Sequence, residues 1–274
     1  METSQSVIIW WRLLSFIAAF NICLLIYSYL KLKGKLPMVS DQLKRIRNWQ
    51  FLLAAIYTLG CGFRSILPRG DIRRIVLYDH WISSVAIGRS VATIAELSFV
   101  AQWCFILYEA GIHTGNKTLL KIAKLPFILI VIAEMFSWYA CTTTNYIGSV
   151  VEESLWAVAA AVTLYGFVIA RKYYTKAQHH FFSAGIMASA LYVVYMVTVD
   201  VPNYVRGWLA GKANGKVYST LVEGFREVAT EWRLTRSYVD WQYEFVWMTL
   251  YFSLAVWISI YIVNGPFLDR NLRK

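Results

Sequence analysis

The sequence is poor in the residues on which several kinds of chemistry depend. It has only four histidines, which excludes the multi-histidine boxes of membrane di-iron oxidases. Its four cysteines include no C-x-x-C spacing, so we expect small buried apolar residues rather than a redox or metal site, at Cys23, Cys61, Cys104 and Cys141. No G-x-S-x-G nucleophile motif is present. We therefore expect neither a metal nor a cofactor.

Charge is also scarce: charged residues make up 16% of the chain and hydrophobic residues 58%. Seven apolar runs approach the ~20 residues that a helix needs to cross a bilayer, at residues 7–28, 49–66, 88–110, 122–143, 149–170, 181–200 and 243–264. This pattern predicts an all-α polytopic membrane protein, a seven-transmembrane-helix bundle that forms one domain over residues 1–274. No basic segment precedes the first run and no small-residue cleavage site follows it, so we expect a retained anchor.

The net charge of +11 would suggest nucleic acid as the partner of a soluble protein. Here the membrane topology explains it, and we expect no nucleic-acid partner. Alternate connections between the seven runs hold 15 of the 27 basic residues but only three of the 16 acids; the bases are Lys31, Lys33, Lys35, Lys44, Arg45, Arg47, Lys117, Lys121, Lys124, Arg171, Lys172, Lys176, Arg270, Arg273 and Lys274. The positive-inside rule places them in the cytoplasm and predicts an N-out, C-in orientation.

This topology implies a multi-pass protein of a plasma membrane or a bacterial inner membrane, with the lipid bilayer as its first partner. The basic segment of residues 31–47, which contains Lys31 and Arg47, is interspersed with apolar residues. Such a segment suits anionic lipid headgroups. The oligomeric state is not predicted.

Two longer connections fall on the predicted outer side. Residues 67–87 contain Asp79 and His80 and are too polar to span, so we expect an outer interfacial helix or re-entrant segment. Residues 201–242 are expected to form an outer loop. Within it, apolar residues recur at helical spacing over residues 218–232, which predicts an amphipathic helix on the outer face between helices 6 and 7. That helix is either a lid over a pocket or an interfacial brace.

The third run carries an ionisable pair. Arg89, Thr93 and Glu96 follow the i, i+4, i+7 spacing that places side chains on one helix face. Ionisable residues inside a membrane segment are costly enough to indicate a functional site, and Arg89 and Glu96 are each other's expected partners.

Other ionisable and aromatic residues map to the same outer half of the predicted bundle. Carboxylates crowded in this way cannot all ionise cheaply, so a proton or cation should offset them. The candidate ligand-binding residues are Arg64, Arg89, Glu96, Glu134, Glu152, Asp200 and Glu244, with aromatic walls from Trp138, Trp156, Tyr192, Trp247 and Tyr251. The favoured function is binding of a small cation, proton or polar solute for permeation or transport.

Two alternatives stay open. In the first, the chain is a membrane-embedded enzyme acting on a lipid or lipid-linked substrate at the outer interface. Arg69, Arg73 and Arg74 would then clamp a phosphate-bearing headgroup, and acid/base work would fall to Glu96, Glu134, Asp79 or His80. In the second, the chain is a non-catalytic subunit or receptor whose charges are structural salt bridges.

Overall fold

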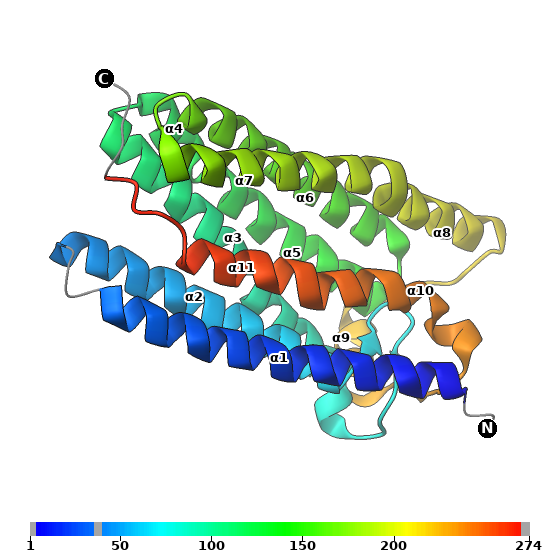
Figure 1. The fold of residues 1–274 in the computed structure, drawn as a ribbon. Coiled ribbons are helices and arrows are strands. Elements are labelled where there is room, and N and C mark those ends of the chain that lie inside the picture. Colours follow the sequence, from blue (N-terminus) through cyan, green and yellow to red (C-terminus); the bar gives the residue numbers. More distant parts are fainter. Residues whose placement is uncertain (1–3, 36–39, 270–274) are drawn as a thin grey trace. The chain divides into compact units, whose positions relative to one another are not determined.

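The computed structural model describes residues 4–35 and 40–269 and is predominantly helical (Figure 1). Within this part of the chain, five helices are long and apolar enough to cross a membrane: Gln5–Gly34, Val85–Thr114, Tyr146–Arg171, Lys176–Ala213 and Tyr238–Val263. The prediction of a helical protein with several membrane-length helices is therefore confirmed.

Two of the seven predicted crossings fall on helices outside this set. The run at residues 49–66 lies in α2 (Asp41–Ile66), which begins with Asp41, Lys44, Arg45 and Arg47. The run at residues 122–143 lies largely in α5 (Leu125–Thr143), a helix of only 19 residues. The count of seven and the N-out orientation therefore stay predictions. Arg270, Arg273 and Lys274, and residues 36–39 of the basic segment, lie outside the described residues.

The chain divides into two compact units. Unit 1 comprises residues 1–99, 141–144 and 218–264. Unit 2 comprises residues 100–140, 145–217 and 265–274.

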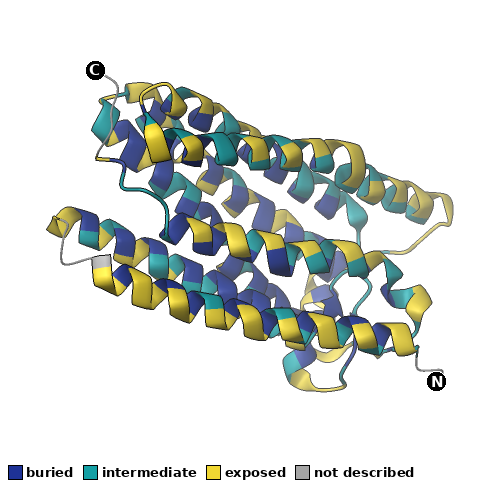
Figure 2. Ribbon diagram, in the orientation of Figure 1, coloured by how far each residue is buried: buried dark blue, intermediate teal, exposed yellow. Residues whose placement is uncertain are grey.

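Unit 1 is mostly helical and also contains the three short strands described below. Its helices are α1 (Gln5–Lys35), α2, the first half of α3 (Val85–Thr114), α9 (Leu221–Thr230), α10 (Tyr238–Leu250) and α11 (Val256–Val263). The helix α1 packs against α2 and α11, and α11 also packs against α2. Figure 2 shows an exposed stripe along α1 opposite its buried one, where Phe16 keeps 69% of its surface exposed. Such an apolar outer face suits contact with lipid.

Residues 67–84 contain no α-helix, so the interfacial helix expected within residues 67–87 is not present; the position of this segment relative to a membrane stays a prediction. The segment forms a hairpin of β1 (Arg69–Gly70) and β2 (Ile75–Val76), followed by the 3₁₀ turn η2 (Trp81–Ser83). A third strand, β3 (Arg233–Leu234), pairs parallel with β2. The turn between β1 and β2 forms its backbone bonds locally. The strand β3 begins 157 residues after the end of β2, so no local periodicity in the sequence could have predicted this pairing.

Unit 2 is built around α6 (Tyr146–Arg171). It also holds the second half of α3, α4 (Lys117–Ile122), most of α5, α7 (Lys176–Tyr195) and α8 (Val201–Ala213). A π-helical turn, η3 (Met196–Asp200), joins α7 to α8, so the helix continues through Lys176–Ala213. The expected outer loop therefore does not begin at residue 201, and α8 packs on α6. Pro202 stands at the second residue of α8, directly after the π turn, where the regular i→i−4 hydrogen-bond pattern is already interrupted.

The amphipathic helix expected over residues 218–232 is present as α9. Thr220 caps its first turn: its hydroxyl accepts from the backbone N–H of Glu223, whose carboxylate accepts from the N–H of Thr220. Gly224 and Val228 are buried, whereas Val222 and Phe225 are exposed.

Candidate functional site

The expected pair on α3 is present in unit 1. Arg89 Nη2 donates to Glu96 Oε2 at 2.9 Å, and both side chains are buried. The helical spacing of seven residues places them on one face, as the sequence indicated.

A second arginine, Arg64, lies in the same polar cluster. Its Nη2 donates to Asp71 Oδ2 at 3.1 Å, and its guanidinium also interacts electrostatically with Glu96 and Arg89. The rings of Trp247 and Phe252 lie about 6 Å from the guanidinium carbon, at 5.9 and 6.0 Å. The charges of Arg64, Arg89, Asp71 and Glu96 balance within unit 1.

Two tyrosines complete this cluster. The Tyr57 ring stacks on Phe99 at 4.5 Å and meets Tyr251 edge-on at 5.9 Å. Both tyrosines interact electrostatically with Glu96. Tyr251 is the first residue of a π-helical turn, η4 (Tyr251–Ala255), between α10 and α11. We call Arg64, Asp71, Arg89, Glu96, Tyr57 and Tyr251 the arginine cluster.

Tyr57 and Asp71 were missed by sequence reasoning. A signal for Tyr57 exists, because Tyr57, Cys61 and Arg64 repeat the i, i+4, i+7 spacing that exposed the pair on α3. No such signal exists for Asp71, which lies in the hairpin turn.

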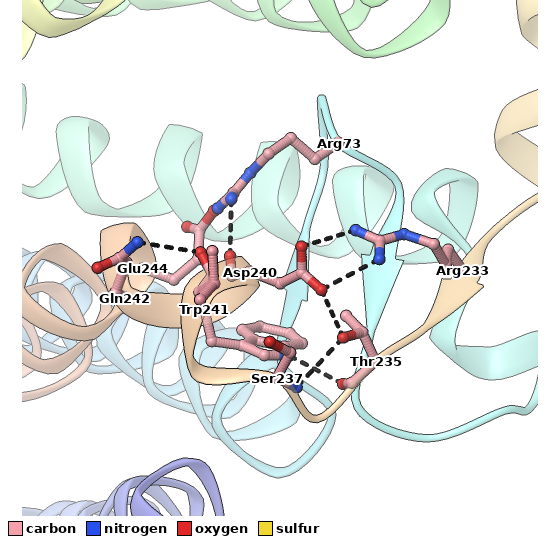
Figure 3. A network of polar contacts seen from close by, with 9 residues as sticks. Arg73, Arg233, Thr235, Ser237, Asp240, Trp241, Gln242 and Glu244 are labelled. Atoms are coloured by element: carbon pink, nitrogen blue, oxygen red, sulfur yellow. Dashed lines mark hydrogen bonds and ion pairs between the residues drawn. The ribbon is translucent and has the colours of Figure 1, made fainter. Parts of the chain in front are cut away.

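Glu244 joins a network at the start of α10 (Figure 3). Arg73 donates to Glu244 Oε1 at 2.5 Å and to the backbone oxygen of Asp240 at 2.6 Å. The other carboxylate oxygen of Glu244 accepts from Trp247 Nε1 at 2.5 Å. Arg233 donates to both carboxylate oxygens of Asp240, at 2.8 and 3.0 Å. These bonds tie the hairpin and β3 to α10.

The other two arginines of the expected phosphate clamp are also engaged inside unit 1. Arg74 donates to Glu227 at 2.6 Å and to the backbone oxygen of Thr142 at 2.8 Å. Arg69 is completely buried and donates to the backbone oxygens of Ser84 and Leu67, at 2.6 and 3.3 Å. Burial lowers the pKa of Arg69 to about 10.

Asp79 and His80, the possible acid/base dyad, bind different partners. Asp79 Oδ1 accepts from Trp232 Nε1 at 2.8 Å, whereas His80 Nδ1 accepts from the backbone N–H of Ile82 at 3.2 Å. Both side chains are exposed. Each residue therefore has a local structural role.

Unit 2 holds a pair of acids. Glu134 on α5 and Glu152 on α6 are both buried, and each offers a carboxylate oxygen within 4.8 Å of the other. Carboxylate oxygens are ligands that hard cations prefer. Glu96 belongs to unit 1, so its predicted convergence with Glu134 and Glu152 stays a prediction.

The remaining candidates of unit 2 lie on α5, α6 and the long helix that follows. Trp156 is buried and meets Tyr192 edge-on at 6.5 Å. Trp138 is partly buried on α5. Asp200 lies in the π turn η3 and interacts with Tyr195. Comparison of the chain with protein-family models, curated proteins and solved structures gives no match.

Proposed function

We propose that this chain is a multi-pass membrane protein that binds a proton or a small cation at Glu134 and Glu152, for permeation or transport. The proposal includes seven crossings with the N-terminus outside and the C-terminus inside. The observation that carries it is the approach of these two buried carboxylates to within 4.8 Å on helices of unit 2.

Two ionised carboxylates at this separation repel each other strongly. At 4 Å the repulsion is ~4 kcal/mol for an effective dielectric constant of about 20. A shared proton or a bound cation removes it. Because α6 is a membrane-length helix, the charge would be held where bulk water does not solvate it. Glu134 and Glu152 would bind the ion, while Trp156 and Tyr192 would wall the site.

The arginine cluster has a different role in this proposal. Arg64 and Arg89 neutralise Asp71 and Glu96, which joins α2 to the hairpin turn and closes an ion pair within α3. This part of the molecule favours the structural salt bridges of the subunit alternative. The lipid-enzyme alternative has less support, because both Nη groups of Arg69, Arg73 and Arg74 already donate to acceptors within unit 1.

The experiment tests whether a proton or a metal cation is bound to the chain. The purified chain in neutral detergent is examined by infrared spectroscopy for a protonated carboxylic acid near neutral pH, and by calorimetric titration with Na⁺, K⁺ and Ca²⁺. We expect either an infrared band or a cation-binding isotherm that disappears in Glu134→Gln and in Glu152→Gln. Proteoliposome flux of the same ion should disappear with it.

Glu231→Gln serves as the control, because Glu231 is an exposed acid in the segment after α9. It should leave band, binding and flux unchanged. The proposal is overturned if the native chain shows neither a protonated acid nor a bound cation, or if the Glu231 variant loses the signal as well.

A further inference from the structure

A basic pocket lies in unit 2, away from the carboxylate pair. It has a volume of about 280 Å³ and is lined by Val168, Arg171, Lys172, His179 and Ile186. The lining comes from the last turns of α6, the residue that follows it, and the first half of α7, which packs beside α6 (Figure 1).

The charge of this pocket is positive. Arg171 Nε donates to His179 Nε2 at 3.0 Å, which makes His179 an acceptor in this geometry and leaves the two Nη groups of Arg171 outside that bond. Within residues 4–35 and 40–269, the structure gives neither Arg171 nor Lys172 a carboxylate partner. Arg171 and Lys172 are thus two cations without a carboxylate counter-ion in that part of the chain, and the His179 ring holds the guanidinium of Arg171 in place. Such a pair suits an anion with several acceptor oxygens.

The walls of the pocket are apolar. Val168 lies one turn before Arg171 on α6, and Ile186 lies two turns after His179 on α7. The pocket stands where one membrane-length helix ends and the next begins. At such a helix end, on either side of a bilayer, a basic side chain contacts lipid headgroups, and an apolar wall contacts the part of the acyl chains nearest the headgroups.

We propose that this pocket binds a phosphate-bearing anion, with Arg171 and Lys172 contacting the phosphate oxygens and Val168 and Ile186 contacting the apolar part of the same molecule. Its volume is near the lower end of the ~300–1,000 Å³ of ligand pockets, which suits a headgroup and its attachment rather than a large solute. This site is independent of the proton or cation site at Glu134 and Glu152.

The test uses the full chain, freed of lipid in a neutral detergent. Phosphatidylglycerol, or phosphatidylcholine for comparison, is titrated in and the bound lipid is counted by native mass spectrometry. We expect phosphatidylglycerol to bind more tightly, and its affinity to fall about tenfold or more in Arg171→Gln/Lys172→Gln, a loss consistent with two charge-assisted hydrogen bonds.

Two further variants separate the pocket from general surface charge. Lys121→Gln/Lys124→Gln removes the same charge from exposed positions of unit 2 and should leave the affinity nearly unchanged. Ile186→Trp keeps every charge but fills the pocket, and should weaken binding as the arginine and lysine variant does. Thermal unfolding checks that each variant is folded.

A second arm identifies the source of the phosphate. If inorganic phosphate competes with the lipid at millimolar concentration, the ligand is a free phosphate compound; if only lipid binds, it is a headgroup. Both outcomes support the site. The proposal is overturned if Arg171→Gln/Lys172→Gln or Ile186→Trp binds phosphatidylglycerol as the native chain does, or if the control variant loses as much affinity.

Discussion

Arg89 and Glu96 form a buried ion pair within a single helix, seven residues apart, with 2.9 Å between Nη2 and Oε2. The guanidinium of Arg64 also interacts electrostatically with the carboxylate of Glu96. The negative charge of Glu96 therefore interacts with two arginines of unit 1, one of which, Arg64, also pairs with Asp71.

The first prediction concerns this charge. Glu96→Gln should destabilise the folded chain by about 3–5 kcal/mol, because it breaks the buried, hydrogen-bonded ion pair with Arg89. The measurement is the thermal or denaturant midpoint of the detergent-solubilised protein. The double variant Arg89→Gln/Glu96→Gln should regain part of the loss. A Glu96→Gln protein as stable as the native one would show that the pair contributes nothing to folding.

Close packing of α9 gives a second prediction. A Cβ added at Gly224 would lie 2.2 Å from the backbone oxygen of Thr142, which cannot move away without shifting the main chain. Gly224→Ala should therefore lift α9 from its place and raise hydrogen exchange in residues 221–230. Gly62→Ala is the matched control, because nothing lies within 4 Å of a Cβ there. It should leave stability equal or raise it by up to ~1 kcal/mol.

The helical part of the molecule could be predicted from the sequence because its signals are local. The spacing of Arg89 and Glu96 sets their pairing within one helix. The recurrence of apolar residues at helical spacing over residues 218–232 likewise predicts α9. Both follow from a period of 3.6 residues and need no knowledge of a distant segment.

The acid dependence of α9 is the third prediction. Hydrogen bonds from Arg74 and Ser219 hold the pKa of Glu227 below its ordinary value of 4.5. A depressed folded-state pKa contributes stability above the unfolded value, which is lost as the pH falls through the folded value. We therefore expect α9 to stay protected from hydrogen exchange at neutral pH and to open progressively below about pH 4.5.

Glu227→Gln isolates this effect. Without the titrating group, protection of residues 221–230 should be weaker at neutral pH and should change less between pH 6 and pH 3, a range that spans the ordinary glutamate pKa of 4.5. An unchanged pH profile in this variant would contradict the assignment to Glu227.

Membrane orientation gives the fourth prediction. Asn116-Lys117-Thr118 is a glycosylation acceptor sequence on a connection assigned to the inner side, so it should stay unmodified in a eukaryotic host. Lys216→Thr creates an acceptor sequence at residues 214–216, on the opposite side in this topology, and should add one glycan. The measurement is an enzyme-sensitive mass shift. A glycan at Asn116 would show that the orientation is the reverse of the one predicted.

The polar part of unit 1 was much harder to predict. Arg73 and Glu244 are 171 residues apart, and Arg74 and Glu227 are 153 apart, so no local pattern joins them. Arg69 was expected at a headgroup, but it is completely buried beside Gly88. A Cβ at Gly88 would lie 2.0 Å from Arg69 Nη1; the missing side chain makes room for the guanidinium, a complementarity that only coordinates reveal.

The two π turns, η3 and η4, change which residues of the long helices lie on the same face. Each one inserts a residue beyond the ordinary repeat, so everything after it is rotated by about 100° from the position that an unbroken α-helix would give. Residues 256–263, which pack against α2, are therefore offset by that rotation from the pattern of α10. Tyr251 and Asp200, each inside such a turn, sit where the phase of the helix changes.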